Sequence, residues 1–407
     1  MHDSIIILKN SLLQGIARTL PSSKSISNRV LIINALAGGG SSLGNLSDAN
    51  DTQLMLRLVN SKAEEIDVED AGTTMRFLTA YFSVANEKKV MTGSHRMKER
   101  PIGILVNALR SLGANIEYLG AEGYPPHKLN GFATQKVNTI KIRGDVSSQY
   151  ISALMMVGPK LPQGLSLELE GKIGSRPYIE MTASLMKHFG VNLDFTGNKI
   201  TIAPQSYKPA AFTVESDWSG ASYWYSFAAL AEKAEIILPR ISLTSLQGDR
   251  AIADIAEHFG VRSEPGAENT IKLTKTTSKG EIHWDFTHCP DLAQTVAVIC
   301  AAKNIKGFFT GLESLRIKET DRIAALQQEL RKIGADLVED DAAHWRLVPS
   351  QALPKTASFN TYKDHRMAMA FAPLATLLEQ VEIENPAVTR KSYPTFWDDV
   401  KDMGFKM

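Results

Sequence analysis

The sequence predicts an α/β protein of two lobes, each built from three copies of one helix-and-strand unit. Three observations predict it: a composition typical of large globular chains, a recurring helix–glycine–strand junction, and two joints rich in Gly, Pro and Ser. The chain has 407 residues, of which 43% are hydrophobic and 22% are charged. That is enough apolar material for two or three domains with cores of their own.

The recurring unit is an amphipathic helix, a short apolar stretch ending in glycine, and two short strands separated by a turn. Each glycine stands where the residue after a helix turns left-handed, which only glycine does without steric cost. The five clearest copies carry this glycine at Gly113, Gly190, Gly260, Gly334 and Gly404. Their spacing of roughly 70–77 residues is too long for a stacked solenoid and suits a subdomain repeated about six times. A sixth, weaker copy ends near Val59 and Asn60. The alternative is chance, because such junctions are common in α/β chains.

The two joints divide the chain into lobes. They are Leu20–Ser23 and Glu215–Gly220. If the chain crosses between lobes at both, residues 1–20 and 219–407 form one discontinuous lobe, and residues 21–218 form a continuous one.

Composition and motifs exclude several functions. Lys and Arg number 45 against 44 Asp and Glu, so no global field attracts nucleic acid or an anionic membrane. No signal peptide and no membrane-spanning run are expected. Two cysteines, Cys289 and Cys300, predict a reduced, cytoplasmic location rather than a disulfide framework. Walker A and GxGxxG spacings are absent, and His283 with His288-Cys289 falls short of a zinc signature.

Cationic or hydroxyl side chains stand at six expected helix starts. Lys24 is the clearest, because the macrodipole disfavours a cation in the first turn of a helix unless an anionic ligand binds there. The other starts are Gly72-Thr73-Thr74 before Arg76, Arg96–Arg100 before a helix begun by Pro101, Ser147–Gln149 with the related Ser175-Arg176-Pro177, Lys318 with Arg322, and Arg366. Taken singly, each group has a plain alternative as an ordinary cap or a solvated, charged face.

The Lys318–Arg322 group is the most informative. On one continuous helix, these two cations would be neighbours of like charge, which costs about 0.2–0.5 kcal/mol unless an anion lies between them. Glu319 beside both cations is a candidate acid or base. Several such groups in a chain of net charge +1 predict one cleft for small substrates carrying phosphates and carboxylates.

These motifs, in this order, resemble those of the 5-enolpyruvylshikimate-3-phosphate synthase (3-phosphoshikimate 1-carboxyvinyltransferase) family over nearly the whole chain. The resemblance implies a two-lobed inside-out α/β barrel, with three βαβαββ units per lobe and the active site in the cleft between the lobes. It implies transfer of the enolpyruvyl group of phosphoenolpyruvate to the 5-hydroxyl of shikimate 3-phosphate, with release of phosphate, in aromatic amino-acid biosynthesis. It also implies no metal and no organic cofactor.

The same resemblance implies the site residues. Phosphoenolpyruvate would be held by Lys24, Gly72, Arg96, Gln149, Arg322, Arg366 and Lys391. Shikimate 3-phosphate would be held by Ser25, Arg29, Ser147, Ser148, Gln149, Ser175, Asp291, Ser314 and Lys318. Asp291 would accept the proton of the 5-hydroxyl and Glu319 would protonate the methylene carbon. Lys24 would stabilise charge or shuttle a proton.

Two positions depart from the family pattern: Asp70 and Ser314 stand where it often has Asn, which predicts altered affinity with unchanged chemistry. The alternatives are a UDP-N-acetylglucosamine enolpyruvyl transferase and a non-catalytic phosphometabolite sensor. The UDP-N-acetylglucosamine enolpyruvyl transferase usually carries a reactive cysteine in a loop of the lobe that folds first. Both cysteines of this chain lie in its second half. We expect a monomer that binds only its small-molecule substrates and neither nucleic acid nor membrane. The family is also inhibited by glyphosate.

Overall fold

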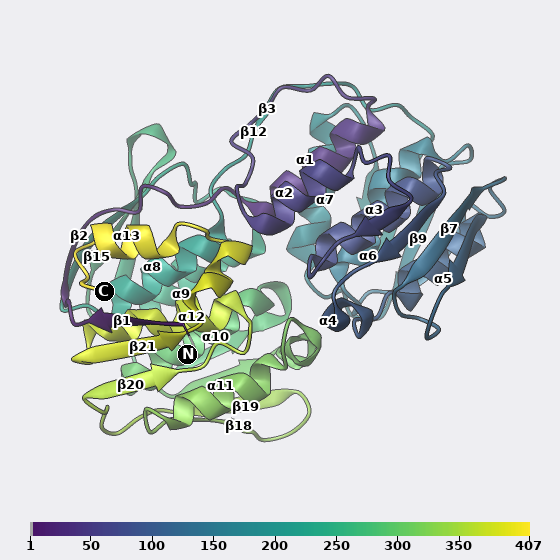
Figure 1. Cartoon of the computed structure of the whole chain (residues 1–407). Coiled ribbons are helices and arrows are strands. Elements are labelled where there is room, and N and C mark those ends of the chain that lie inside the picture. The colour runs from purple at the N-terminus through teal and green to yellow at the C-terminus, as the bar shows by residue number, and fades with distance from the viewer. Residues whose placement is uncertain (1–2) are drawn as a thin grey trace. The chain divides into compact units, whose positions relative to one another are not determined.

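The computed structural model describes residues 3–407, which divide into two compact units (Figure 1). The larger unit comprises residues 3–23, Asp48–Asn50 and Glu215–Met407, and the smaller unit comprises Lys24–Ser47 and Asp51–Val214. The main boundaries adjoin the two Gly/Pro/Ser-rich joints of the sequence. Each unit has its own hydrophobic core.

The smaller unit contains three sheets. Its strands are β3 (Leu43–Gly44), β4 (Glu65–Asp67), β5 (Lys89–Thr92), β6 (Ala114–Tyr118), β7 (His127–Phe132), β8 (Thr139–Arg143), β9 (Leu165–Glu170), β10 (Asp194–Thr196), β11 (Lys199–Ile202) and β12 (Phe212–Thr213). The sheet orders are β4-β5-β7-β6, β10-β11-β9-β8 and β12-β3. The helices are α1 (Lys24–Leu36), α2 (Asn50–Leu58), α3 (Gly72–Val84), α4 (His95–Lys98), α5 (Gly103–Leu112), α6 (Ser148–Val157) and α7 (Arg176–His188).

The larger unit repeats this plan. Its strands are β1 (Ser4–Leu8), β2 (Leu12–Ile16), β13 (Lys233–Leu238), β14 (Val261–Pro265), β15 (Ile271–Lys275), β16 (Ile282–Asp285), β17 (Gly307–Thr310), β18 (Asp336–Glu339), β19 (His344–Val348), β20 (Thr356–Phe359) and β21 (Gln380–Glu384). The sheet orders are β14-β15-β13-β2, β16-β17-β19-β18 and β1-β21-β20. The helices are α8 (Trp218–Leu230), α9 (Ile252–His258), α10 (Ala293–Ala302), α11 (Arg322–Arg331), α12 (His365–Phe371) and α13 (Phe396–Asp402). In Figure 1, purple β1 lies beside yellow β21, so the two ends of the chain share one sheet.

The predicted repeat is visible in the pairing of the strands. Each of the six sheets contains one parallel pair, such as β4 with β5 or β16 with β17. A parallel pair needs a crossover, and a helix supplies it in four of the six pairs, such as α3 between β4 and β5. Four copies have the full βαβαββ order, while the β1-β21-β20 and β12-β3 sheets belong to shorter copies. The predicted α/β class is confirmed.

One helix of each copy lies inside its unit. In the smaller unit α1, α3 and α6 contact one another, and in the larger unit α8, α10 and α12 do so. Nearly all residues of α8, α10 and α12 are buried. The first two helices are mainly apolar, whereas α12 also buries His365 and Arg366. The beginnings of these six inner helices carry about half of the predicted site residues.

The repeated glycine has the predicted left-handed backbone in all five clear copies. At Gly260, φ is +77° and an added Cβ would overlap the carbonyl oxygen of Thr276. The chain therefore needs glycine there for its backbone conformation and also for the close approach of the following loop.

Two predicted helix starts were wrong. Lys318 and Arg322 do not share a helix, because Lys318 is extended (φ −88°, ψ −153°) and α11 begins only at Arg322. The Asp321 side chain accepts a hydrogen bond from the backbone N–H of Ala324 and so sets the helix start. Pro101 does not begin α5, which starts at Gly103 after the cap residue Ile102.

Candidate active site

A buried guanidinium organises the polar cluster of the larger unit. Arg322, the first residue of α11, is 2% exposed and binds a different carboxylate through each of its three nitrogens. The bonds run from Nε to Asp364 Oδ2 (2.7 Å), from Nη1 to Asp291 Oδ1 (2.9 Å) and from Nη2 to Glu319 Oε2 (2.9 Å). Burial opposes the charge, but Asp364, Glu319 and Asp291 outweigh it and raise the pKa of Arg322 above its usual range.

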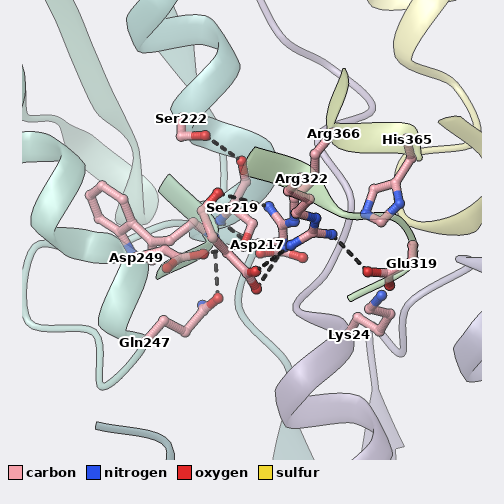
Figure 2. A network of polar contacts seen from close by, with 12 residues as sticks. Lys24, Asp217, Ser219, Ser222, Gln247, Asp249, Glu319, Arg322, His365 and Arg366 are labelled. Atoms are coloured by element: carbon pink, nitrogen blue, oxygen red, sulfur yellow. Dashed lines mark hydrogen bonds and ion pairs between the residues drawn. The ribbon is translucent and has the colours of Figure 1, made fainter. Parts of the chain in front are cut away.

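A second arginine closes the cluster around Asp291. Arg366 Nη2 lies 2.9 Å from Asp291 Oδ2, so Arg322 and Arg366 hold the two oxygens of one carboxylate. Arg366 also donates to the Tyr223 hydroxyl and the Ser219 Oγ, each at 3.3 Å. In Figure 2, Glu319 lies on one side of Arg322 and Ser219 lies on the other. Burial opposes ionisation of Asp291, but Arg366, Lys318 and Arg322 together hold the pKa of Asp291 well below its usual range.

Glu319 links Arg322 to a second cation. Its Oε1 lies 3.2 Å from Lys391 Nζ, and its Oε2 accepts the bond from Arg322. Lys391 ends the 3-10 segment Pro386–Lys391, whereas Glu319 lies just before α11. Both side chains are about one-sixth exposed, at 15% and 16%. The Glu319 carboxylate is therefore fixed in direction but remains accessible to a small molecule.

The helix beginnings explain why these groups meet. Asp364 caps α12 by accepting from the backbone N–H of Arg366, and its other oxygen accepts from Arg322. Asp291 lies in the 3-10 turn Pro290–Leu292, which leads into α10. Ser219 follows the cap residue Asp217 at the start of α8. The three inner helices of the larger unit thus bring their N-terminal ends to one polar cluster.

Sequence reasoning missed part of this cluster. Asp364 stands beside the predicted Arg366 but had no assigned role, although Asp before a helix start is a cap signal. No spacing or motif in the sequence pointed to Asp249 or Ser219 as site residues. Asp249 is 2% exposed and hydrogen-bonds the Ser219 hydroxyl. Burial, together with the charge of Asp291, raises the pKa of Asp249 to about 7.

The smaller unit presents its predicted residues at the beginnings of α1, α3 and α6. Lys24 begins α1 and pairs with Asp51 at 3.1 Å. Gly72 begins α3, and Gln149 in the first turn of α6 donates to Thr73 Oγ1 at 2.9 Å. Ser147 is the cap of α6, with Ser148 as the first helical residue. The structure therefore joins the α3 and α6 beginnings directly.

Arg29 lies deeper in the smaller unit. It is 2% exposed and donates to Ser25 O (2.8 Å), Thr182 Oγ1 (2.7 Å) and Ser152 Oγ (3.1 Å). All three acceptors are neutral, and burial lowers the pKa of Arg29 to about 10. A buried guanidinium satisfied only by neutral acceptors favours binding of an anion.

The remaining predicted residues are more exposed. Arg96 on α4 pairs with Glu99 at 2.9 Å, and its hydrogen bond is the main cause that lowers the pKa of Glu99. Ser175 precedes α7 in a left-handed conformation (φ +49°) and makes no capping hydrogen bond with its side chain. Ser314 is exposed in the 3-10 turn Glu313–Ile317, and the described residues include no hydrogen-bond partner of its hydroxyl within the Arg322 cluster. The structure thus does not join Ser314 to the carboxylates.

The departure at Asp70 has a local partner. The Asp70 carboxylate accepts a hydrogen bond from the Ser94 hydroxyl, which also caps α4 by accepting from Met97 N.

Within residues 3–407, no three His, Cys, Asp or Glu side chains are grouped as metal ligands. In the same range, no helix has the length and apolar character needed to cross a bilayer.

Comparison with known proteins decides the family. A model of the EPSP synthase (3-phosphoshikimate 1-carboxyvinyltransferase) family matches residues 8–63 and 58–400. The chain belongs to this family. A 3-phosphoshikimate 1-carboxyvinyltransferase of Bacteroides fragilis (strain YCH46) is 49% identical over 392 residues, which cover 95% of this chain and 94% of the relative. One of Vibrio atlanticus (strain LGP32) is 37% identical over 411 residues, covering 94% and 95%.

The fold agrees with that of a solved family member. The EPSP synthase of Acinetobacter baumannii superimposes with a TM-score of 0.79 at 20% sequence identity, covering 99% of each chain. The family predicted from the motifs and the two-lobed α/β fold are confirmed. The predicted enzyme, a 3-phosphoshikimate 1-carboxyvinyltransferase, is supported over the UDP-N-acetylglucosamine enolpyruvyl transferase and the sensor.

Proposed function

We propose that this enzyme of the EPSP synthase family transfers the enolpyruvyl group of phosphoenolpyruvate to the 5-hydroxyl of shikimate 3-phosphate at the Arg322 cluster. The observation that carries the assignment is a pair of carboxylates, Asp291 and Glu319, held on one buried guanidinium at 2.9 Å each. The reaction needs one group to accept a proton from the hydroxyl and another to give a proton to the alkene. Two carboxylates with different neighbours can divide these roles.

Asp291 is proposed as the acceptor. In the structure Arg322 and Arg366 hold its carboxylate in the ionised form, which fixes its position but weakens it as a base. The anionic groups of phosphoenolpyruvate would compete for Arg366 and Arg322. Each hydrogen bond that leaves Asp291 for the substrate raises its proton affinity. Substrate binding would thus prepare Asp291 to take the proton of the 5-hydroxyl.

Glu319 is proposed as the donor to the methylene carbon. Protonation there makes C2 electrophilic, and the 5-hydroxyl oxygen forms the new bond to C2 as Asp291 takes its proton. Glu319, now a carboxylate, would take a proton back from the new methyl group, which restores the double bond. The bond from C2 to the phosphate oxygen breaks, and phosphate leaves with the proton held by Asp291. Lys391, 3.2 Å from Glu319, would stabilise the carboxylate after it has given its proton.

The substrate-binding residues are proposed from both units. Phosphoenolpyruvate would contact the cationic and N–H groups of Lys24, Gly72, Arg96, Gln149, Arg322, Arg366 and Lys391. Shikimate 3-phosphate would contact the hydroxyl, amide and charged groups of Ser25, Arg29, Ser147, Ser148, Gln149, Ser175, Asp291, Ser314 and Lys318. Support comes from the inner-helix beginnings, where N–H groups and side-chain donors favour anions. The monomeric state and the cytoplasmic location remain predictions.

The test is release of inorganic phosphate by the purified chain. Phosphate should appear only when phosphoenolpyruvate and shikimate 3-phosphate are both present, together with a product heavier than shikimate 3-phosphate by one enolpyruvyl group. UDP-N-acetylglucosamine in place of shikimate 3-phosphate should give no phosphate. Binding of both ligands without phosphate release would reject the proposal in favour of a sensor.

A further inference from the structure

Arg100 places its guanidinium over the beginning of α3. It lies between α4 and α5 in the smaller unit and is half-buried. A Cβ added to Gly72 would lie 2.8 Å from both Nη1 and Nη2 of Arg100, and 2.6 Å from Nη1 of Arg76. Two guanidinium groups therefore face the first residue of α3. This approach is possible only because Gly72 has no side chain.

The charge of Arg100 has no protein counter-charge. Within residues 3–407, no carboxylate oxygen lies within 4.0 Å of it, and its hydrogen bond to Asp70 O is long at 3.5 Å. Its Nε is buried without an acceptor. Five other arginines of the smaller unit are paired with carboxylates, namely Arg57, Arg96, Arg110, Arg143 and Arg176. Two neighbouring guanidiniums with one of them unpaired create a local positive potential that an anion would relieve.

The beginning of α3 adds donors to that potential. Its cap residue, Ala71, offers no side-chain hydrogen bond, and its first turn contains no acidic residue. By contrast, Ser147 caps α6 with its side chain. The first N–H groups of α3 are thus left for another acceptor. Gln149 on α6 contacts Thr73 in this same turn.

We propose that Arg100 is a further phosphoenolpyruvate-binding residue, whose guanidinium fork holds one anionic group of the substrate together with the first turn of α3. The inference rests on the proposed function and adds a ligand to its phosphoenolpyruvate site. A carboxylate and a phosphate both fit a planar fork of donors. Arg76 donates to Gly72 O at 2.8 Å and to Pro101 O at 3.3 Å, and so links the first turn of α3 to the segment before α5.

The experiment compares Arg100→Gln and Arg100→Lys with the parent enzyme by steady-state phosphate release. Arg100→Gln should raise the KM for phosphoenolpyruvate on the order of tenfold or more, which corresponds to about 1.4 kcal/mol per tenfold. The KM for shikimate 3-phosphate should stay within about twofold, because Arg100 lies at the phosphoenolpyruvate site and would not contact that ligand. The KM of Arg100→Lys for phosphoenolpyruvate should lie between those of the parent and Arg100→Gln, since lysine keeps the charge and loses the guanidinium fork. Inhibition by inorganic phosphate should weaken if the phosphate is held, and stay unchanged if the carboxylate is held.

Arg143→Gln is the matched control, because Arg143 is an exposed arginine of the same unit already paired with Asp145. It should leave both KM values unchanged. An Arg100→Gln enzyme with a parental KM for phosphoenolpyruvate would overturn the inference. So would equal changes in both KM values with a lowered Tm, which would make Arg100 a packing residue. If the parent itself releases no phosphate, the proposed function fails instead.

Discussion

Arg322 shows how a single residue can orient several carboxylates. A guanidinium is planar and has donors in fixed directions, so three carboxylates bound to three nitrogens are fixed relative to one another. Asp364 accepts from Nε and, at 3.5 Å, from Nη2, whereas Asp291 accepts from Nη1 and Glu319 from Nη2. Lysine has one nitrogen and no fixed plane, and it could not hold the same arrangement.

Replacement of Asp291 by Asn keeps the size of the side chain but removes its proton affinity. Turnover should fall by roughly 10²–10⁴-fold, the usual contribution of a positioned general base. The KM for shikimate 3-phosphate should also rise, because the carboxylate is a proposed hydroxyl partner. Steady-state kinetics provide the measurement. Parental turnover in Asp291→Asn would remove the residue from proton transfer.

Asp249 gives a prediction about pH and stability. Burial and the nearby Asp291 raise its pKa to about 7, so the folded chain holds a proton that the unfolded chain releases near pH 4. Stability from this group is therefore lost as pH rises from about 4 through about 7. Across this window, the free energy of unfolding of Asp249→Asn should rise relative to that of the parent. Above about pH 7, the difference between the two proteins should stay constant. Denaturant titrations at several pH values test it, with exposed Asp254→Asn as control.

A constant difference between Asp249→Asn and the parent from pH 5 to pH 8 would contradict this account. The Asp254 control should show a constant difference, because its side chain is 56% exposed on α9. Tryptophan fluorescence suits the measurement, since all five tryptophans follow residue 215 and so lie in the same unit as Asp249.

At the scale of elements, the helix beginnings bring the site together. Asp217, Asp321 and Asp364 accept backbone N–H bonds at the starts of α8, α11 and α12. Each cap sets the residue at which its helix begins, and therefore the direction of the next side chains. Arg322 and Arg366 point into the cluster because each follows its cap by one or two residues.

The helix endings make a separate prediction about stability. Gly260→Ala should destabilise the chain by more than the roughly 1–2 kcal/mol of a left-handed alanine, because its Cβ also meets Thr276. Gly280→Ala is the control: its φ is outside the left-handed range and nothing lies within 4 Å of an added Cβ. That variant should be neutral or slightly stabilising. Thermal unfolding of both variants provides the measurement, and equal Tm values would refute the prediction.

Local patterns predicted much of the fold, and the cationic helix starts predicted the kind of site. The helix ends at Gly113 and Gly260 were predictable, because the left-handed backbone after a helix is a local requirement that glycine meets. The start of α11 was not, since Lys318 and Glu319 are good helix formers, and the helix begins after them at the Asp321 cap. Asp249 was not predictable either, because its partner Ser219 lies thirty residues away and no periodic pattern links them.

For the whole molecule, the two units have separate hydrophobic cores. One core is built from residues 26–214 and the other from the N-terminal strands together with residues 218–405. Independent cores allow independent unfolding, since cooperativity depends on shared buried contacts. The proposed catalytic carboxylates belong to the larger unit, so loss of that unit's core alone would abolish turnover.

Tryptophan fluorescence and circular dichroism should therefore report different unfolding curves. Fluorescence follows the larger unit alone, whereas circular dichroism follows helices of both. Gly260→Ala should shift the fluorescence midpoint, and Gly113→Ala, with φ +123° in the smaller unit, should shift only the part seen by circular dichroism. Superimposable curves for both probes in all three proteins would show that the units unfold as one.

We propose that the two carboxylates on Arg322 divide the proton transfers, and Glu319→Gln tests this division of roles. Gln keeps the shape and the hydrogen-bond acceptor for Arg322 but cannot give a proton to the alkene. Phosphate release under saturating substrates should fall by roughly 10²–10⁴-fold while both substrates still bind. Glu313→Gln, an exposed residue of the preceding 3-10 turn, should match the parent. Near-parental phosphate release by Glu319→Gln would contradict the account.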